Sequence, residues 1–266
     1  MSARYAVYAL PGALSPDPVR PLAEAWLGRS ADGQPVTGAV PTGWTRAEVD
    51  AITVDARRYG FHATLKAPFR LADGVAEGSL YARASELASR TAPVTIPRVR
   101  LHRLDGFYAL VPGAPAPEVD ALAGTVVRAF DDLRAPLTDA ERARRRPERL
   151  TTRQRELLDT WGYPYVLDEL RVHLTLTDQV PQRDQTRVEA ALVEHFGGYL
   201  SEPFAGFLGR DMLVDALCVY AEPEPGAPFV LRSVHPLEGS RSVTPPSPST
   251  PVAAAAFAVP AFGNHP

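Results

Sequence analysis

The chain has 266 residues, of which 45% are hydrophobic and 22% are charged, a composition ordinary for a soluble globular protein. The formal net charge of -3 gives no bulk electrostatic case for a protein that binds a polyanion such as nucleic acid. The single cysteine, Cys218, excludes an internal disulfide and a cysteine-rich metal site, and its apolar sequence neighbours indicate a buried, inert thiol.

The sequence has no segment that is typical of targeting or of a membrane anchor. The first residues lack the charged start and apolar stretch of a signal peptide, and no apolar run reaches the length of a bilayer span. We therefore expect a cytoplasmic protein with no membrane partner.

The first half of the chain predicts strands and helices in alternation. Apolar periodicity of two or of 3.6 residues, bounded by Gly and Pro, distinguishes the two kinds of element. The expected elements are a strand at 4–10, a helix at 18–27 stopped by Gly28, a short helix or turn at 46–56, a strand at 61–71, a helix at 78–92, strands at 94–104 and 106–111 joined by a tight turn at Asp105-Gly106, and a helix at 115–133.

The second half begins with a stretch of different composition, rich in Arg and Glu, at 138–160. It is either a basic insertion that covers an active site or a solvated helical connector, and charge alternation favours the connector. The remaining expected elements are a strand at 169–177, a helix at 181–196, strands at 212–221 and 229–234, and, from 238, a Pro-, Ser- and Ala-rich tail that is expected to be disordered.

Two copies of one four-residue signature stand about 110 residues apart. They are His62-Ala63-Thr64-Leu65 and His173-Leu174-Thr175-Leu176. With 6 His in the chain, two such quartets have a chance on the order of one in a thousand. A single histidine of this kind is as easily structural as functional, so it is the pair of quartets that indicates a functional site.

Both quartets lie in predicted strands, where alternate side chains point to opposite faces. Strict alternation places Lys66 on the same face as His62 and Thr64, and it places Arg171 on the same face as His173 and Thr175. Two such strands side by side would bring together two imidazoles and two hydroxyls. Such a group can activate a water, protonate a leaving oxygen and hold a phosphate.

These motifs and three longer strings resemble the 2H phosphoesterase superfamily, which includes RNA and tRNA-processing cyclic phosphodiesterases. The strings run from Arg58 to Phe69, from Asp105 to Val111 and from Leu170 to Thr177. They are most similar to an uncharacterised family of phosphonate-metabolism proteins that is often encoded beside carbon–phosphorus lyase genes. The resemblance covers about residues 3 to 236 and does not include the Pro/Ser/Ala-rich tail.

The resemblance implies an α+β fold of two duplicated lobes, with antiparallel sheets, helices on the outer faces and a central cleft. In these terms the domain is 1–237, with lobes at about 1–133 and 161–237, a connector at 134–160 and a tail at 238–266. It implies His62 and His173 as the catalytic pair and Thr64 and Thr175 as the phosphate-binding residues.

Which histidine is acid and which is base is open in the sequence, and we favour His173 as acid and His62 as base. Lys66 and Arg171 are candidates for binding the substrate, although a solvated charge at a strand end is an equal alternative for each. Tyr59 is a candidate for stacking on the substrate, with an ordinary core aromatic as the alternative. We expect neither a metal nor a cofactor, because two histidines without nearby carboxylates make a poor metal site.

The function expected from these residues is a metal-independent cyclic phosphodiesterase acting on a small phosphorylated partner, a cyclic phosphate ester. In phosphonate catabolism this would be a ribose cyclic phosphate, such as phosphoribosyl 1,2-cyclic phosphate. One alternative is a phosphodiesterase for RNA 2′,3′-cyclic ends, for which 142–149 would have to supply the basic groove. Another is a non-catalytic nucleotide- or phosphate-binding module.

Overall fold

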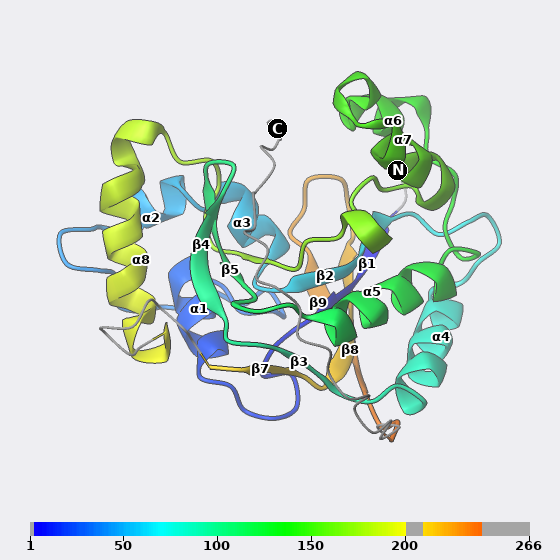
Figure 1. The fold of residues 1–266 in the computed structure, drawn as a ribbon, viewed down its shortest axis with the longest axis horizontal. Coiled ribbons are helices and arrows are strands. Elements are labelled where there is room, and N and C mark those ends of the chain that lie inside the picture. Colours follow the sequence, from blue (N-terminus) through cyan, green and yellow to red (C-terminus); the bar gives the residue numbers. More distant parts are fainter. Residues whose placement is uncertain (1–2, 201–209, 241–266) are drawn as a thin grey trace, which may run out of the picture.

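The computed structural model describes residues 3–200 and 210–240, which form an α+β fold of antiparallel strands and helices (Figure 1). The strands are β1 (Arg4–Ala9), β2 (Ala63–Phe69), β3 (Val94–Ile96), β4 (Arg100–Leu104), β5 (Phe107–Val111), β6 (Leu174–Thr175), β7 (Met212–Val214), β8 (Ala216–Glu222) and β9 (Val230–Pro236). The α-helices are α1 (Val19–Leu27), α2 (Arg46–Ala51), α3 (Val54–Tyr59), α4 (Glu77–Ser89), α5 (Pro117–Ala129), α6 (Asp139–Arg144), α7 (Thr152–Trp161) and α8 (Gln185–Leu200). Short 3₁₀ turns are η1 (Pro147–Arg149), η2 (Leu167–Glu169) and η3 (Gln182–Asp184).

Seven strands form one sheet in the order β4-β5-β6-β2-β1-β8-β9, and β3 pairs with β7 in a second sheet. All of these pairings are antiparallel. Strands β8 and β9 follow the connector at 134–160 but β8 pairs with β1, whereas β5 precedes the connector and pairs with β6. Strand pairing therefore crosses the division into lobes that the sequence predicts.

The helices lie around this sheet in three groups. Helices α4 and α5 contact β9, β8 and β2, while α1 contacts α8 and α2. Helices α6 and α7 come from the predicted connector and lie together at one corner of the molecule, far from α1, α2 and α8 (Figure 1). We call the segment 138–161, which contains α6, η1 and α7, the helical cap.

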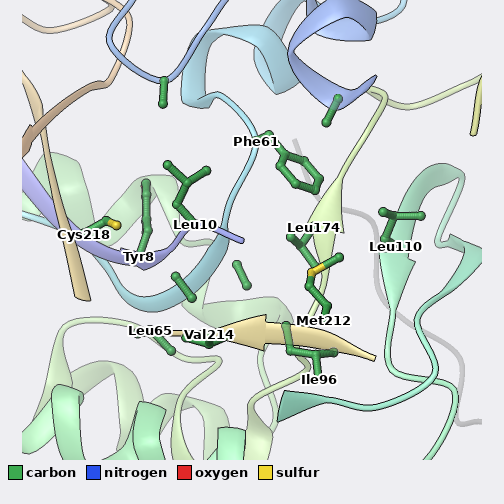
Figure 2. Packing of buried hydrophobic residues seen from close by; sticks show 14 of the residues in the cluster. Tyr8, Leu10, Phe61, Leu65, Ile96, Leu110, Leu174, Met212, Val214 and Cys218 are labelled. Carbon is green, nitrogen blue, oxygen red and sulfur yellow. The ribbon is translucent and has the colours of Figure 1, made fainter. Parts of the chain in front are cut away.

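The apolar residues of the two motif strands lie in the core, as their alternation predicts. Leu65 is 2% exposed, and Leu174 and Leu176 are fully buried. Figure 2 shows Leu65 and Leu174 packed in one cluster with Met212 and Val214 of β7. Burying a leucine side chain contributes about 1.5–3 kcal/mol, so this packing fixes which face of each motif strand is turned away from the core.

Several sequence predictions are confirmed. Gly28 ends α1 with a left-handed φ of 69°, and Asp105 and Gly106 form the β4–β5 turn with φ of 45° and 100°. Cys218 is fully buried. Within 3–200 and 210–240, no helix has the length and apolarity to cross a bilayer. The predicted tail lies outside the described residues from 241 onward.

Two predicted strands are shorter than expected. The run at 94–104 is divided, because Arg98 has a φ of 45° and directs β3 and β4 into different sheets. Of the second motif run at 169–177, only Leu174 and Thr175 are in a strand, and the run begins within the 3₁₀ turn η2, where Leu167 has a φ of 55°. Positive φ at these residues is not visible in an apolar alternation, so the pattern overestimates both strands.

Candidate functional site

The two signature quartets lie next to each other in the sheet. Ala63 of β2 is paired with Leu174 of β6 in antiparallel register. In such a register the neighbouring positions also face each other, so His62 is opposite Thr175 and Thr64 is opposite His173. The tertiary structure thus brings the two His/Thr pairs together at one place, which we call the motif site.

The His62 imidazole is held at both ring nitrogens. Nδ1 lies 2.9 Å from the Gly60 carbonyl oxygen, and Nε2 lies 3.2 Å from Oγ1 of Thr64. A carbonyl can only accept, so Nδ1 carries the proton in the neutral ring and Nε2 is left as an acceptor. The hydrogen-bond pattern therefore assigns Nε2 as the nitrogen that faces the motif site with a lone pair.

Gly60 shapes the backbone that presents this carbonyl. It ends α3 with φ 78° and ψ 176°, a conformation that residues with a side chain avoid. Because of this turn, only Phe61 and His62 are needed after Gly60 to connect helix α3 to β2. The sequence string before the first quartet thus contains the glycine that orients its histidine.

Helix α3 is itself fixed by groups from distant parts of the chain. Asp178, just after β6, accepts hydrogen bonds from the backbone N–H groups of Asp55 at 3.0 Å and Ala56 at 2.9 Å, at the N-terminus of α3. Buried Arg29 donates to two carbonyls near the C-terminus of α3, that of Arg57 at 2.9 Å and that of Arg58 at 3.0 Å. Asp178 follows the second quartet, and α3 precedes the first quartet. These hydrogen bonds therefore connect the two motif segments.

A tyrosine from β1 covers one face of the His62 ring. The Tyr8 and His62 ring centroids are 3.6 Å apart with an interplanar angle of 17°. Tyr8 is 1% exposed and also packs against Tyr220 at 5.1 Å. The sequence predicts the β1 strand but not the stacking of Tyr8 on His62. An aromatic residue in a predicted strand was the one sequence feature that pointed to such a contact.

Burial sets the protonation state of His62. Desolvation lowers the pKa of His62 to about 4, the hydrogen bond to Gly60 opposes this shift, and the nearby charge of His173 adds to it. His62 is therefore neutral at neutral pH.

The His173 ring is oriented by its own backbone, as His62 is. Its Nδ1 lies 2.7 Å from the Arg171 carbonyl oxygen, so Nδ1 carries the proton of the neutral ring and donates it to this carbonyl. The ring is half-buried and tilted against Phe107, with centroids 5.8 Å apart. His173 lies just before β6 rather than within it, so the strand that the sequence predicts at this residue is not formed.

Lys66 does not share the face of His62 and Thr64, contrary to the alternation. Tyr8 pairs with Thr64 but Val7 pairs with Lys66, so β2 contains one extra residue at this point. The bulge turns Lys66 toward α5, where Nζ donates to the Val127 carbonyl at 2.9 Å and lies 3.4 Å from Asp131. Burial lowers the pKa of Lys66 to about 8, and the Asp131 carboxylate opposes this shift.

The other predicted site residues occupy different surroundings. Tyr59 stacks on Phe229, with centroids 5.1 Å apart and an angle of 18°, and Arg58 lies over its ring at 5.3 Å. Thr175 is half-buried on β6, and Arg171 is exposed beside His173. In the described parts of the chain, no group of three or more His, Cys, Asp or Glu side chains is arranged to hold a metal ion.

Two curated relatives are similar in sequence to most of this chain. It is 39% identical over 231 residues to "Ribose 1,5-bisphosphate phosphokinase PhnN" of Janthinobacterium sp. (strain Marseille), covering 85% of this chain and 49% of the relative. A relative of the same name from Laribacter hongkongensis is 39% identical over 234 residues, covering 86% of this chain and 50% of the relative. The chain spans about half the length of the curated relatives it matches.

Two solved structures resemble the fold distantly. The TT0787 protein of Thermus thermophilus is 15% identical with a TM-score of 0.44, covering 90% of this chain and 100% of that one. A structure described as a phosphoesterase is 15% identical with a TM-score of 0.41, covering 89% of this chain and 99% of that one. At these TM-scores the likeness carries no argument. Residues 64–230, more than half of the chain, match the family described as "Protein of unknown function (DUF1045)", and the chain therefore belongs to the DUF1045 family.

Proposed function

We propose that the protein is a phosphoesterase of the 2H type that hydrolyses a cyclic phosphate ester without a metal ion. The observation that carries this proposal is the pairing of Ala63 with Leu174, which sets two His-x-Thr quartets opposite each other. Both imidazoles donate through Nδ1 to a backbone carbonyl, so in each neutral ring the lone pair that can accept a proton is on Nε2. Two such nitrogens facing a phosphate are the minimum that general acid–base hydrolysis needs.

In this mechanism Nε2 of neutral His62 accepts a proton from water as the water oxygen attacks phosphorus. The bond from phosphorus to one ring oxygen breaks, and Nε2 of the His173 imidazolium donates a proton to that oxygen. The Thr64 and Thr175 hydroxyls donate to the non-bridging phosphate oxygens. The product is a phosphomonoester with a free hydroxyl, and the two histidines return to their starting protonation states by exchange with solvent before the next turnover.

The depressed pKa of His62 favours it as the base, because a ring that is neutral at pH 7 can accept a proton. A bound phosphate carries negative charge between the rings, and this charge raises the pKa of both imidazoles. It thereby supports the protonated state that His173 needs as the acid, and it strengthens His62 as a base at the moment of attack.

The names of the relatives support a choice of substrate. They are named for phosphorylating ribose 1,5-bisphosphate, and this chain spans only about half of their length. Hydrolysis of the P–O2 bond of 5-phosphoribosyl 1,2-cyclic phosphate yields ribose 1,5-bisphosphate. We propose that the present chain performs this opening, and that in the longer relatives the remaining half consumes the product.

The test is to incubate the purified protein, with a chelator present, with 5-phosphoribosyl 1,2-cyclic phosphate, nucleoside 2′,3′-cyclic monophosphates and an RNA with a 2′,3′-cyclic end. Products are identified by phosphorus NMR. We expect opening of the sugar ring by the wild type and none by the His62→Ala/His173→Ala double variant, whose folding is checked by circular dichroism. Full activity in the double variant would overturn the mechanism, and hydrolysis of the nucleotide or RNA ends alone would overturn the substrate.

A further inference from the structure

The helical cap places one arginine against an aromatic residue of the segment that leads to the second quartet. The guanidinium carbon of Arg145, at the C-terminal end of α6, lies 4.8 Å from the centroid of the Tyr163 ring. Tyr163 also packs edge-on against Tyr165, with centroids 5.7 Å apart. The cap and the segment that leads to the second quartet therefore meet at this arginine.

Electrostatic effects connect Tyr163 to the residues around His62. Burial raises the pKa of the Tyr163 hydroxyl, Arg145 opposes this rise, and Tyr59 adds to it. Burial likewise raises the pKa of Tyr8 well above its usual value, and Tyr59 and Tyr163 are among the hydroxyls that add to this. Tyr163 also lines one cavity together with Lys66 and Phe69 of β2, the strand that carries Thr64 of the first quartet.

Arg145 differs from three arginines at the cap that are engaged by carboxylates. The ion pairs join Arg142 to Asp159, Arg153 to Asp168 at 2.6 Å, and Arg70 to Glu141 at 3.0 Å. Among the residues that the structure describes, no carboxylate lies within 4.0 Å of Arg145, whose cation is instead placed by the ring of Tyr163. Its N–H donors therefore remain for an anion.

The cations closer to β1 and β2 are already satisfied within the protein. Arg4 and Arg58 both bind Glu222, which is fully buried, and Lys66 is bound to Val127 and Asp131. A substrate that carries a phosphomonoester besides its cyclic phosphate needs a further cation, because an unpaired phosphate that loses its water is costly to bind. Arg4, Arg58 and Lys66 each have a carboxylate partner, whereas Arg145 is positioned by the ring of Tyr163.

We infer that Arg145, together with the Tyr163 hydroxyl, binds a second phosphate group of the substrate, the one that is not cleaved. This inference rests on the proposed function and deepens it, because it assigns the protein to cyclic phosphates of phosphorylated sugars. The guanidinium donates to two phosphate oxygens, as its fork geometry favours, and the phenol donates to the third. The cap then selects the substrate, while the motif site performs the chemistry.

The experiment compares two substrates that differ only in the second phosphate: 5-phosphoribosyl 1,2-cyclic phosphate and ribose 1,2-cyclic phosphate. The ratio of their kcat/KM values measures what the second phosphate contributes. We expect Arg145→Gln to lower this ratio about 10- to 100-fold, through KM, which is the effect of one charge-assisted contact. Tyr163→Phe keeps the ring beneath Arg145 and removes only the hydroxyl, so we expect a smaller fall of the same kind.

Two control variants make the result specific. Arg144→Gln changes an exposed arginine one residue away and should leave the ratio unchanged. Arg171→Gln tests the exposed arginine beside His173. If the ratio falls in Arg171→Gln and not in Arg145→Gln, or if Arg145→Gln lowers both kcat/KM values equally, the assignment to Arg145 is wrong.

Failure of the proposed function gives a different result, namely no turnover of either substrate by the wild type. In that case calorimetric binding of ribose 1,5-bisphosphate and of ribose 1-phosphate decides the inference. A preference for the bisphosphate that is lost in Arg145→Gln and kept in Arg144→Gln supports the second phosphate site. Equal binding of the two sugars by the wild type, or a preference unaffected by Arg145→Gln, overturns it.

Discussion

His62 and His173 are oriented by the same local device. In each, Nδ1 donates to the carbonyl of the residue two positions earlier, Gly60 at 2.9 Å and Arg171 at 2.7 Å. The bond fixes the tautomer and the ring rotation from within the same chain segment. In each neutral ring the lone pair is therefore on Nε2, the nitrogen to which the proposed mechanism gives the proton transfers.

The pH dependence of kcat/KM should be bell-shaped with an acidic limb at unusually low pH. A base must be unprotonated, and the pKa of free His62 is about 4, so we expect activity to persist below pH 6 and to fall only as pH approaches 4. His62→Gln should lose this limb along with about 10²–10⁴-fold in rate. An acidic limb that survives in His62→Gln would assign the base to another residue.

The titration of His62 can be followed directly by NMR of its ring protons. We expect a midpoint near pH 4 in the free protein, and a higher one in His173→Gln, because removing the neighbouring imidazolium removes a charge that lowers the pKa of His62. Added inorganic phosphate should raise the pKa further by placing an anion beside the ring. A pKa unchanged by phosphate would mean that the anion does not bind between the histidines.

Gly60→Ala should impair both stability and activity. The φ of 78° disfavours any side chain, although an added Cβ has no atom within 4 Å, so the cost is backbone strain of about 1–3 kcal/mol. The carbonyl that accepts from His62 would rotate as the strain relaxes. Gly197→Ala, in helix α8 with equally open space around the Cβ, is the matched control and should stabilise by about 0.5–1 kcal/mol in urea unfolding. Equal effects of the two substitutions would contradict this role of Gly60.

Replacement of Tyr8 should separate packing from chemistry. Tyr8→Phe keeps the ring stacked on His62 and should retain most of the activity, whereas Tyr8→Leu removes the stack and should cost about 1–3 kcal/mol of stability together with a clear loss of kcat. Unfolding in urea and steady-state kinetics of both variants check this. If Tyr8→Phe is as inactive as Tyr8→Leu, the hydroxyl rather than the ring matters.

Lys66, the single lysine of the sequence, should make stability rise with pH in the alkaline range. Its pKa is lowered to about 8 in the fold, so between about pH 8 and pH 10.5 the unfolded chain binds a proton that the folded chain has released. The free energy of unfolding therefore increases as pH rises through this window, by roughly 3 kcal/mol at most. Urea unfolding at pH 7.5 and pH 10 should show this gain relative to Lys66→Met. A wild type and variant with parallel pH dependence would show that Lys66 keeps an ordinary pKa.

The short elements with strong local signals were predictable from the sequence. Asp105-Gly106 forms its hairpin because both residues tolerate positive φ, and the motif strands bury Leu65 and Leu174 because their apolar residues alternate. The face of Lys66 was not predictable. It depends on one extra residue in the pairing of β2 with β1, and a bulge is a property of two strands together.

The sequence by itself determined the two His-x-Thr quartets, the apolar faces of the segments that carry them and the α+β class, because these follow from residue type and local periodicity. Only the tertiary structure decided that Ala63 is paired with Leu174, that Tyr8 lies on the ring of His62 and that Arg145 lies on Tyr163. Each of these contacts joins segments that are separated in the chain, and they form because the whole core closes around them. No local pattern encodes which distant partner a side chain will meet.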